Sequence, residues 1–219
     1  MTRRALVGAD VFDGHKMHAR SAVVLNDGMF EAVVSEADIP PDAERAQVAA
    51  GTLTPGFVDL QVNGCGGLLF NDNMSVDALA TMAKAHAGTG TRAILPTLIT
   101  DSPDKTRAAV DAVERAIRAK VPGIVGIHLE GPHLSTARKG AHDPALIRPM
   151  SEADLSMIVQ AAKRLPNVLL TVAPETVTRD PVPHLSQAGV SISLGPSDAH
   201  SATRLDHASA RRACATALL

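Results

Sequence analysis

From Leu53 onward, apolar runs of strand length alternate with segments of helical spacing, and this alternation limits the possible folds more than any other feature. Ser75, Ser102 and Ser151 stand where helix N-caps are expected, and Pro166 follows the end of the third helical segment. The apolar runs lie at residues 57–62, 93–99, 124–129, 168–172 and 190–194. Strands that alternate with helices form parallel β/α units, so the sequence predicts an α/β fold.

Two closures of such a sheet are open, a doubly wound sheet and a (β/α)8 TIM-type barrel. Polar residues favour the barrel because they gather where strands end, as catalytic residues do in barrels. These residues are Gln61, Asn63, Thr97, Glu130, Glu175 and Ser197. A full barrel typically has ~250 residues, and the chain after residue 52 is much shorter. We therefore expect residues 53–219 to form an incomplete barrel of about five β/α units.

Residues 1–52 have a different pattern, with short apolar strands separated by tight turns. Asp13-Gly14 and Asn26-Asp27-Gly28 are turn signals of the hairpin type, and Pro40-Pro41 marks a loop. The pattern predicts a small N-terminal β domain, which we interpret as the N-terminal half of a β-sandwich.

Composition excludes several classes of function. A formal net charge of −2 gives no reason to expect nucleic acid or an acidic membrane surface as a partner. The chain has four Phe, no Tyr and no Trp, so stacking platforms for bases are not expected. Two cysteines make no disulfide framework, and no stretch reaches the ~20 apolar residues of a membrane helix. We expect a cytoplasmic, soluble protein.

The segment from Gly123 to Arg148 contains the strongest candidate for chemistry. An apolar run ends at Glu130, and two histidines follow, His133 and His142. A carboxylate beside apolar residues is costly unless it meets a metal ion, a cation or good donors. One interpretation is a metal site with a loop that grips an anionic ligand. The other is a glutamate that caps a neighbouring helix, with histidines on the surface; spacing alone does not decide between them.

Three blocks of this chain together resemble a known family. The first is His128-Leu129-Glu130-Gly131-Pro132 with Lys139-Gly140-Ala141-His142-Asp143-Pro144 after it. The second runs from Pro55 to Gly67, and the third is Val172-Ala173-Pro174-Glu175. In order and spacing they are similar to the N-acetylglucosamine-6-phosphate deacetylases of the amidohydrolase superfamily, up to about Ser197.

The resemblance implies a hydrolase that removes the N-acetyl group from N-acetyl-D-glucosamine 6-phosphate, giving D-glucosamine 6-phosphate and acetate. It implies one divalent metal ion, zinc first and iron, cobalt or manganese otherwise, with Glu130 as a ligand. It assigns substrate contacts to Ala141 and His142. Gln61 and Asn63 replace the two histidines that many amidohydrolases carry there, so they are expected to line the site rather than hold metal. A homodimer or homotetramer is implied.

The resemblance breaks at Gly195-Pro196-Ser197-Asp198-Ala199, where the family has a metal-binding histidine in the place of Pro196. His200 is a displaced candidate ligand. The family's next histidine block and its catalytic aspartate are not found, so the sequence resembles a family member truncated at the C-terminus. We expect residues from about Pro196 onward to be out of step with the ancestral reading frame, with a tail able to form a helix.

Two alternatives remain open at this point. The chain is either a non-catalytic relic or interaction fragment, or a different amidohydrolase, for example one similar to dihydroorotase or adenine deaminase. The absence of a His-x-His pair at residues 61–63 and the presence of the Glu130 block argue against the second.

Overall fold

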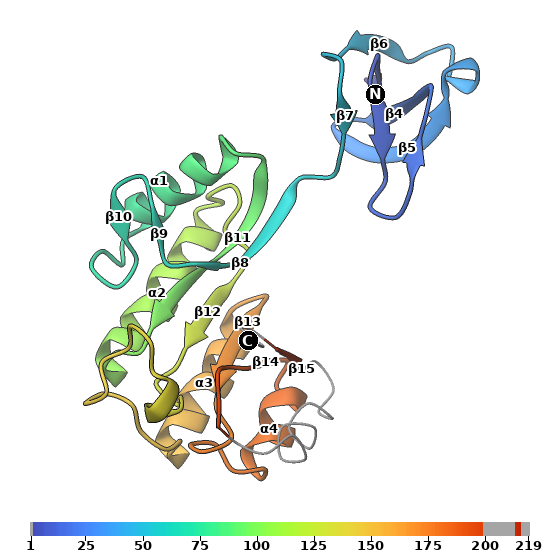
Figure 1. Cartoon of the computed structure of the whole chain (residues 1–219). Helices are drawn as coiled ribbons and strands as arrows, with labels where there is room; N and C mark the ends of the chain where they lie inside the picture. The colour runs from blue at the N-terminus through green and yellow to red at the C-terminus, as the bar shows by residue number, and fades with distance from the viewer. Residues whose placement is uncertain (1, 199–212, 216–219) are drawn as a thin grey trace. The chain divides into compact units, whose positions relative to one another are not determined.

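The computed structural model describes residues 2–198 and the short strand at 213–215. The chain divides into two compact units, Met1–Gly56 and Phe57–Leu219 (Figure 1). This division lies a few residues after the boundary expected at residue 52. The physical reason is strand β7 (Thr52–Leu53), which pairs with β2 (Asp10–Phe12) and so belongs to the first unit.

The first unit consists of two small sheets. One has the order β5-β4-β1-β6 and the other the order β3-β2-β7. The remaining bounds are β1 Arg3–Val7, β3 Met17–His18, β4 Ser21–Asn26, β5 Met29–Ser35, a 3-10 turn at Glu36–Asp38 and β6 Glu44–Gln47. Ala5, Val7, Ala22 and Val24 form its small core.

The second unit is built around one parallel sheet of six strands in the order β15-β14-β13-β12-β11-β8. The strands are β8 Phe57–Val62, β11 Thr91–Ile99, β12 Ile127–Glu130, β13 Val168–Val172, β14 Ser191–Leu194 and β15 Ala213–Ala215. The helices are α1 Val76–Ala87, α2 Pro103–Arg118, α3 Glu152–Arg164 and α4 Pro181–Gln187. A hairpin of β9 (Gly64–Cys65) and β10 (Leu68–Leu69) follows β8, and a 3-10 turn lies at Thr136–Arg138.

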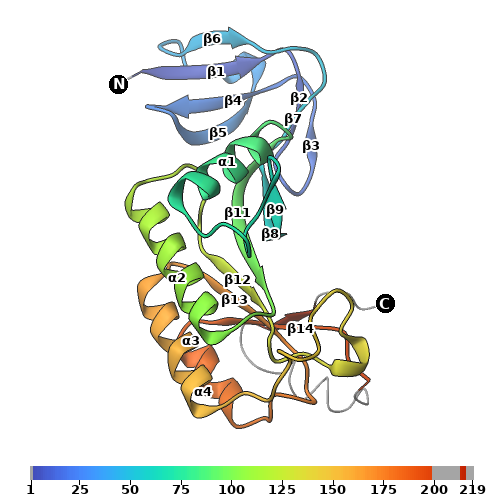
Figure 2. The same ribbon diagram turned by 90° about the vertical axis from the view of Figure 1, so that its left-hand side faces the viewer.

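The helices begin where the sequence predicts. The side chains of Ser75, Ser102 and Ser151 each accept a hydrogen bond from a backbone N–H in the first turn of α1, α2 and α3. Ser151 and Asp154 form a reciprocal capping box, which satisfies two donors that a helix start otherwise leaves unpaired. Figure 2 shows these helices along one face of the sheet.

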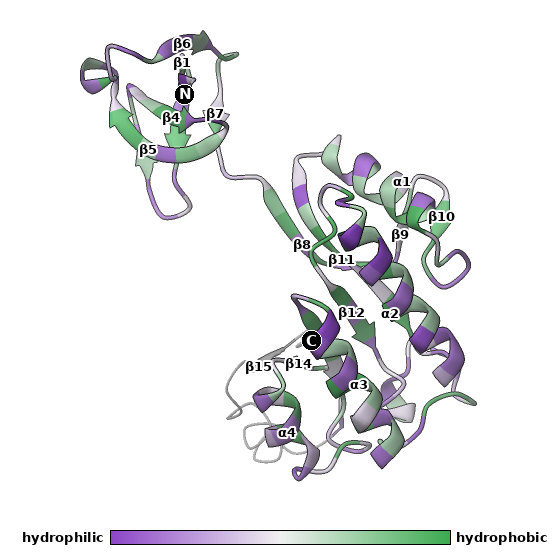
Figure 3. Ribbon diagram, turned by 180° about the vertical axis from the view of Figure 1, so that it is seen from behind, coloured by the Kyte–Doolittle hydropathy of each residue, from purple (hydrophilic) through white to green (hydrophobic). Residues whose placement is uncertain are grey.

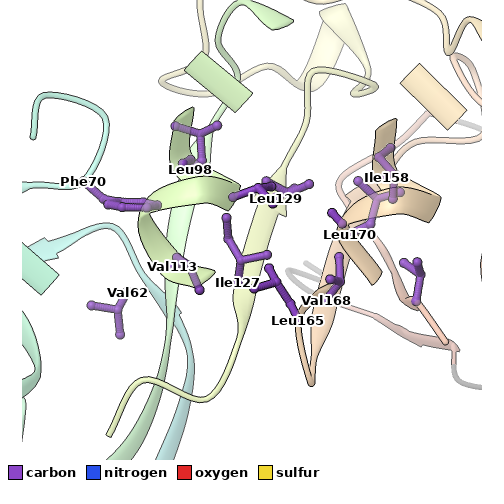
Figure 4. Close-up of a cluster of buried hydrophobic side chains, with 14 of the residues drawn as sticks. Val62, Phe70, Leu98, Val113, Ile127, Leu129, Ile158, Leu165, Val168 and Leu170 are labelled. Carbon is purple, nitrogen blue, oxygen red and sulfur yellow. The ribbon is translucent and has the colours of Figure 1, made fainter. Parts of the chain in front are cut away.

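Alternation along the strands separates two faces. Ile127 and Leu129 of β12 pack in the main hydrophobic core against the helices, with Val168 and Leu170 of β13 beside them (Figure 4). His128 and Glu130 alternate with these residues along β12, so their side chains point to the face of the sheet opposite the helices. This other face contains the polar residues that form the candidate site.

Together these features form the partial (β/α)8 barrel that the sequence predicts. The strand expected at 124–129 begins at Ile127, and Ile124 makes only an isolated bridge to Ile94. The sequence allows the tail to form a helix, but Ala213–Ala215 pair in parallel with β14 and make a sixth strand. Without this sixth strand the edge of β14 would expose backbone donors and acceptors, and pairing with them outweighs the helical preference of alanine.

Among the described residues, no helix is long and apolar enough to cross a membrane.

Candidate functional site

A pocket of about 470 Å³ lies at the C-terminal ends of the parallel strands. Strands β8, β11, β12 and β13 and the loops after β8, β12 and β14 contribute to it. Its lining residues are Gln61, Asn63, Ile99, Glu130, Leu134, Arg138, Lys139, Gly140, Ala141, His142, Thr171 and Pro196. The structure thus brings together Gln61, Asn63, Glu130, Ala141 and His142. The remaining sequence candidate, His200, lies outside the described residues.

Glu130 is the last residue of β12 and presents its carboxylate to this pocket. Gln61 Nε2 donates a hydrogen bond to Glu130 Oε2 at 3.0 Å, and His142 Nε2 lies 3.9 Å from Oε1. Burial alone raises the pKa of this carboxyl group, but the imidazoles of His142 and His128 and the amide of Asn63 outweigh it, so the pKa is lowered. Glu130 is therefore ionised at neutral pH, so its carboxylate can bind a metal ion or accept charge-assisted hydrogen bonds.

His142 is held in one orientation by the residue that follows β11. The backbone N–H of Thr100 donates to His142 Nδ1 at 3.3 Å, and Thr100 Oγ1 lies 2.8 Å from the same nitrogen. Since a backbone N–H only donates, Nδ1 is the acceptor, and the proton of the neutral ring is on Nε2. That N–H points towards Glu130 and the pocket. No sequence motif identifies Thr100; only its place at a strand end hints at a role.

A buried polar layer lies next to Glu130, centred on His128, which is fully buried. His128 Nδ1 lies 3.1 Å from Thr97 Oγ1, and Nε2 lies 2.7 Å from Thr171 Oγ1. Thr97 Oγ1 donates to Leu95 O and accepts from the Val62 N–H, so it accepts from His128 Nδ1–H, and Thr171 donates to Nε2. These hydrogen bonds link four neighbouring strands, β8, β11, β12 and β13, next to the pocket. Sequence analysis missed this role of His128 and Thr171.

Glu175 fixes the loop that follows β14. Its Oε1 accepts hydrogen bonds from Ser197 Oγ and from the Asp198 N–H, both at 2.8 Å. Asp198 in turn accepts from Arg138 Nε at 2.7 Å, which neutralises that guanidinium. Lys139, by contrast, has no carboxylate partner among the described residues. Among the described lining residues, Lys139 is therefore a cation without a carboxylate partner. Glu175 supports the loop that carries Pro196.

The described residues only partly suit the divalent ion that the resemblance implies. Glu130 offers a carboxylate and His142 an imidazole, but Pro196 has no side-chain donor. Within residues 2–198, no group of three His, Cys, Asp or Glu side chains is close enough to hold a metal ion. A catalytic zinc normally takes three protein ligands and a water. The described ligand set therefore does not fit a catalytic metal centre.

Comparison with known sequences places these features in context. The amidohydrolase family profile matches residues 52–180, more than half of the chain. The N-acetylgalactosamine-6-phosphate deacetylase of Shewanella sp. (strain ANA-3) is 41% identical over 200 residues, which cover 90% of this chain and 50% of that protein. The N-acetylglucosamine-6-phosphate deacetylase of Haemophilus influenzae is 31% identical over 195 residues, covering 89% and 51%. The chain thus spans about half the length of these curated relatives.

Solved structures agree with this placement. The N-acetylglucosamine-6-phosphate deacetylase of Pasteurella multocida has a TM-score of 0.86 at 29% identity, with 94% of this chain and 54% of that one covered. A variant of the Mycobacterium smegmatis enzyme, in complex with N-acetyl-D-glucosamine-6-phosphate, has a TM-score of 0.84 at 28% identity, with coverage of 100% and 56%. From the family profile and these relatives, the chain belongs to the amidohydrolase family.

Proposed function

We propose that this pocket is part of the active site of a hydrolase that removes the N-acetyl group from N-acetyl-D-glucosamine 6-phosphate, giving D-glucosamine 6-phosphate and acetate. The observation that carries the proposal is the pair formed by Glu130, ionised, and His142, held with its Nε2–H towards the pocket. Both residues come from the first of the three sequence blocks that resemble deacetylases. The names of the relatives support the same substrate class.

The residues of this chain can bind and orient such a substrate. His142 Nε2–H is placed to donate a hydrogen bond to a substrate oxygen, and Glu130 to accept one. Lys139 lines the pocket and offers a positive charge to a phosphate group. Hydrolysis also needs a general base and more ligands than the described residues supply. The proposal is therefore substrate recognition by this chain, with turnover dependent on additional groups.

A second substrate is N-acetyl-D-galactosamine 6-phosphate, because the Shewanella relative named for it is the more similar of the two sequences compared above. The two sugars differ in the configuration of one hydroxyl group. Both carry the N-acetyl and 6-phosphate groups on which the proposal rests. A binding assay with both sugars decides between them.

Sugar binding is the first prediction. The purified chain should bind N-acetylglucosamine 6-phosphate or its galactosamine counterpart in calorimetry, and glucosamine 6-phosphate more weakly. His142→Gln should weaken binding about tenfold, or by about 1.4 kcal/mol, because glutamine lacks the Nδ1 contact with Thr100 that directs the donor towards the pocket. His184→Gln is the control, since His184 lies on α4 outside the pocket. If neither sugar binds, or if His142→Gln binds as tightly as the unchanged chain, the pocket is a relic without this function.

The proposal includes one divalent ion, zinc first, with Glu130 as a ligand and His200 as a second candidate. We also propose that the protein acts in the cytoplasm and assembles as a homodimer or homotetramer. Glu130 would hold such an ion only together with ligands from outside the described residues, and the ion would then supply Lewis-acid polarisation of the acetamide carbonyl.

Metal binding gives the second prediction. The chain should bind Zn²⁺ weakly in competition with a chromogenic chelator, and Glu130→Gln should weaken binding about tenfold or more, because it replaces a charged ligand with a neutral amide. Glu175→Gln is the matched control, because Glu175 is bonded to Ser197 and Asp198 and does not line the pocket. Equal zinc affinity in the Glu130 and Glu175 variants would show that Glu130 is not a ligand.

A further inference from the structure

His133 is a buried histidine that the proposed function does not use. It follows Glu130 in the sequence as the first of the two candidate histidines, yet it is 1% exposed and does not line the pocket. Its Nδ1 lies 3.0 Å from the backbone oxygen of Arg148. Burial lowers the pKa of the ring, so the ring is neutral at pH 7, and a carbonyl oxygen only accepts. His133 therefore donates one directed hydrogen bond from Nδ1–H to Arg148.

This hydrogen bond closes the base of the segment 133–148, which carries part of the pocket. The backbone N–H of Arg148 also donates to Pro132 O at 3.2 Å, so the two ends of the segment meet twice. A segment whose ends are this close is an Ω-loop, and we call residues 133–148 the pocket loop. It is yellow in Figure 1. Its middle part, residues 138–142, lines the pocket.

The base of the pocket loop is attached to two rigid elements. The backbone oxygen of His133 accepts from the N–H of Ala173, directly after β13, at 2.8 Å. Arg148 Nη2 donates to Asp154 Oδ1 at 2.7 Å, and Asp154 belongs to the capping box of α3. Figure 3 shows hydrophilic and hydrophobic bands along α3, whose buried residue Ile158 belongs to the core. The hydrogen bond between His133 and Arg148 thus joins a loop start held by the sheet to a loop end held by a helix.

Inside the pocket loop the backbone order is local. Its hydrogen bonds join residues three apart, such as the His142 N–H to Lys139 O at 3.0 Å and the Arg138 N–H to Ser135 O at 3.2 Å. Each of these bonds orders a single turn. The position of the turns relative to the sheet depends on the base of the loop. A weaker base lets the turns move while each keeps its own bond.

We propose that His133 is a positioning residue, which fixes the pocket loop so that Lys139 and His142 face the bound sugar phosphate. The inference rests on the proposed function for its ligand, whereas the closed base is a property of the chain alone. A loop held in its binding conformation does not have to be ordered when the ligand arrives. Loss of the His133 hydrogen bond therefore lowers the apparent affinity, because the competent loop conformation is less populated.

The alternative is that the His133 ring only fills space, and two substitutions separate the two roles. His133→Asn carries Nδ2 on its Cγ, where histidine carries Nδ1, so it keeps the donor and loses the volume of the ring. His133→Leu keeps apolar volume and removes the donor. If the hydrogen bond matters, the asparagine variant resembles the unchanged chain. If only the volume matters, the leucine variant does.

Hydrogen exchange of the full chain, measured without sugar, tests whether His133 fixes the loop. His133→Leu should speed exchange of the Arg138 and His142 N–H groups about tenfold, and His133→Asn at most about twofold, because only leucine removes the donor to Arg148. The amides of α2 report any loss of global stability. His86→Leu is the matched control, because His86 lies on α1 and its Nε2 has no partner among the described residues, so no hydrogen bond is lost.

Three exchange results would overturn the proposal. These are unchanged exchange of the loop amides in His133→Leu, equal acceleration in His133→Asn, and acceleration in the loop no larger than in α2 or than in His86→Leu. The last result would mean that the histidine serves stability alone.

Calorimetry with N-acetylglucosamine 6-phosphate and its galactosamine counterpart gives the second readout. His133→Leu should bind about tenfold more weakly than the unchanged chain and His133→Asn within about twofold, although the ring does not line the pocket. Faster loop exchange with equal sugar affinity would also overturn the proposal. If the unchanged chain binds neither sugar, the proposed function fails by itself. Exchange then still decides whether His133 fixes the loop.

Discussion

Lowering the pH from 7 to 5 is expected to reduce the free energy of unfolding by about 2 kcal/mol through His128 alone. Burial lowers the pKa of this imidazole to about 4, from an ordinary value of 6.5. Between these two values the unfolded chain binds a proton on the ring that the folded protein does not. Acidification in this window therefore favours the unfolded state, and the loss is complete only below about pH 4.

The window from pH 7 to pH 5 separates His128 from the carboxylates. Glu130 and Asp154 have pKa values that are lowered on folding, so they also destabilise the protein in acid, but only as the pH falls below about 4.5. His133 has a pKa lowered by burial as well and contributes in the same direction as His128. The total slope should therefore exceed that of one histidine.

Urea denaturation of the chain and of His128→Gln at pH 7, 6 and 5 measures the contribution. Glutamine does not titrate, yet its amide can donate to Thr97 and accept from Thr171, so the variant keeps a polar link across the strands. Between pH 7 and pH 5, the unfolding free energy of the variant should fall by about 2 kcal/mol less than that of the unchanged chain. Equal pH dependence in the two proteins would mean that His128 is protonated in the folded state as readily as in the unfolded state.

The fold was predictable because it rests on local patterns. Serine caps, proline stops and apolar runs determine α1, α2, α3, β8 and β13 without reference to the rest of the chain. The strand at Ala213–Ala215 was not predictable in this way. Its alanines favour a helix, and only the free edge of β14, which is a tertiary feature, favours a strand there.

The candidate site was predictable where a residue follows a strand within a recognisable block, as Glu130 and His142 do. The supporting contacts were not. Thr100 holds His142 across a sequence separation of 42 residues, and Thr171 holds His128 across 43. Threonine is common in strands for packing reasons, so its presence gives no signal of such a role. These pairings exist only after parallel strands are placed in register.

Gly131→Ala is expected to lower the free energy of unfolding by about 3 kcal/mol, from two separate causes. Gly131 has a φ of +91°, a conformation that strains any residue with a Cβ. A Cβ at this position would also lie 2.2 Å from Thr100 Oγ1 and 3.2 Å from Leu134. Gly67→Ala is the matched control, because Gly67 has a φ of +79° and no atom within 4 Å of its added Cβ. It should cost about 1 kcal/mol, the strain alone.

Gly131→Ala should also change the pocket, because the added methyl group displaces Thr100, the residue that orients His142. Moving the Thr100 hydroxyl away from the added methyl group breaks its 2.8 Å contact with His142 Nδ1, so the ring no longer presents Nε2–H in one direction. Sugar binding should then weaken about as much as in His142→Gln, roughly tenfold, whereas Gly67→Ala should bind normally. The double variant Gly131→Ala/Thr100→Ala removes the clashing hydroxyl and should be about 1 kcal/mol more stable than the sum of the single variants predicts. Strict additivity in urea denaturation, or normal sugar binding by Gly131→Ala, would show that Thr100 does not transmit the change. The small residue after Glu130 would then serve only the local turn.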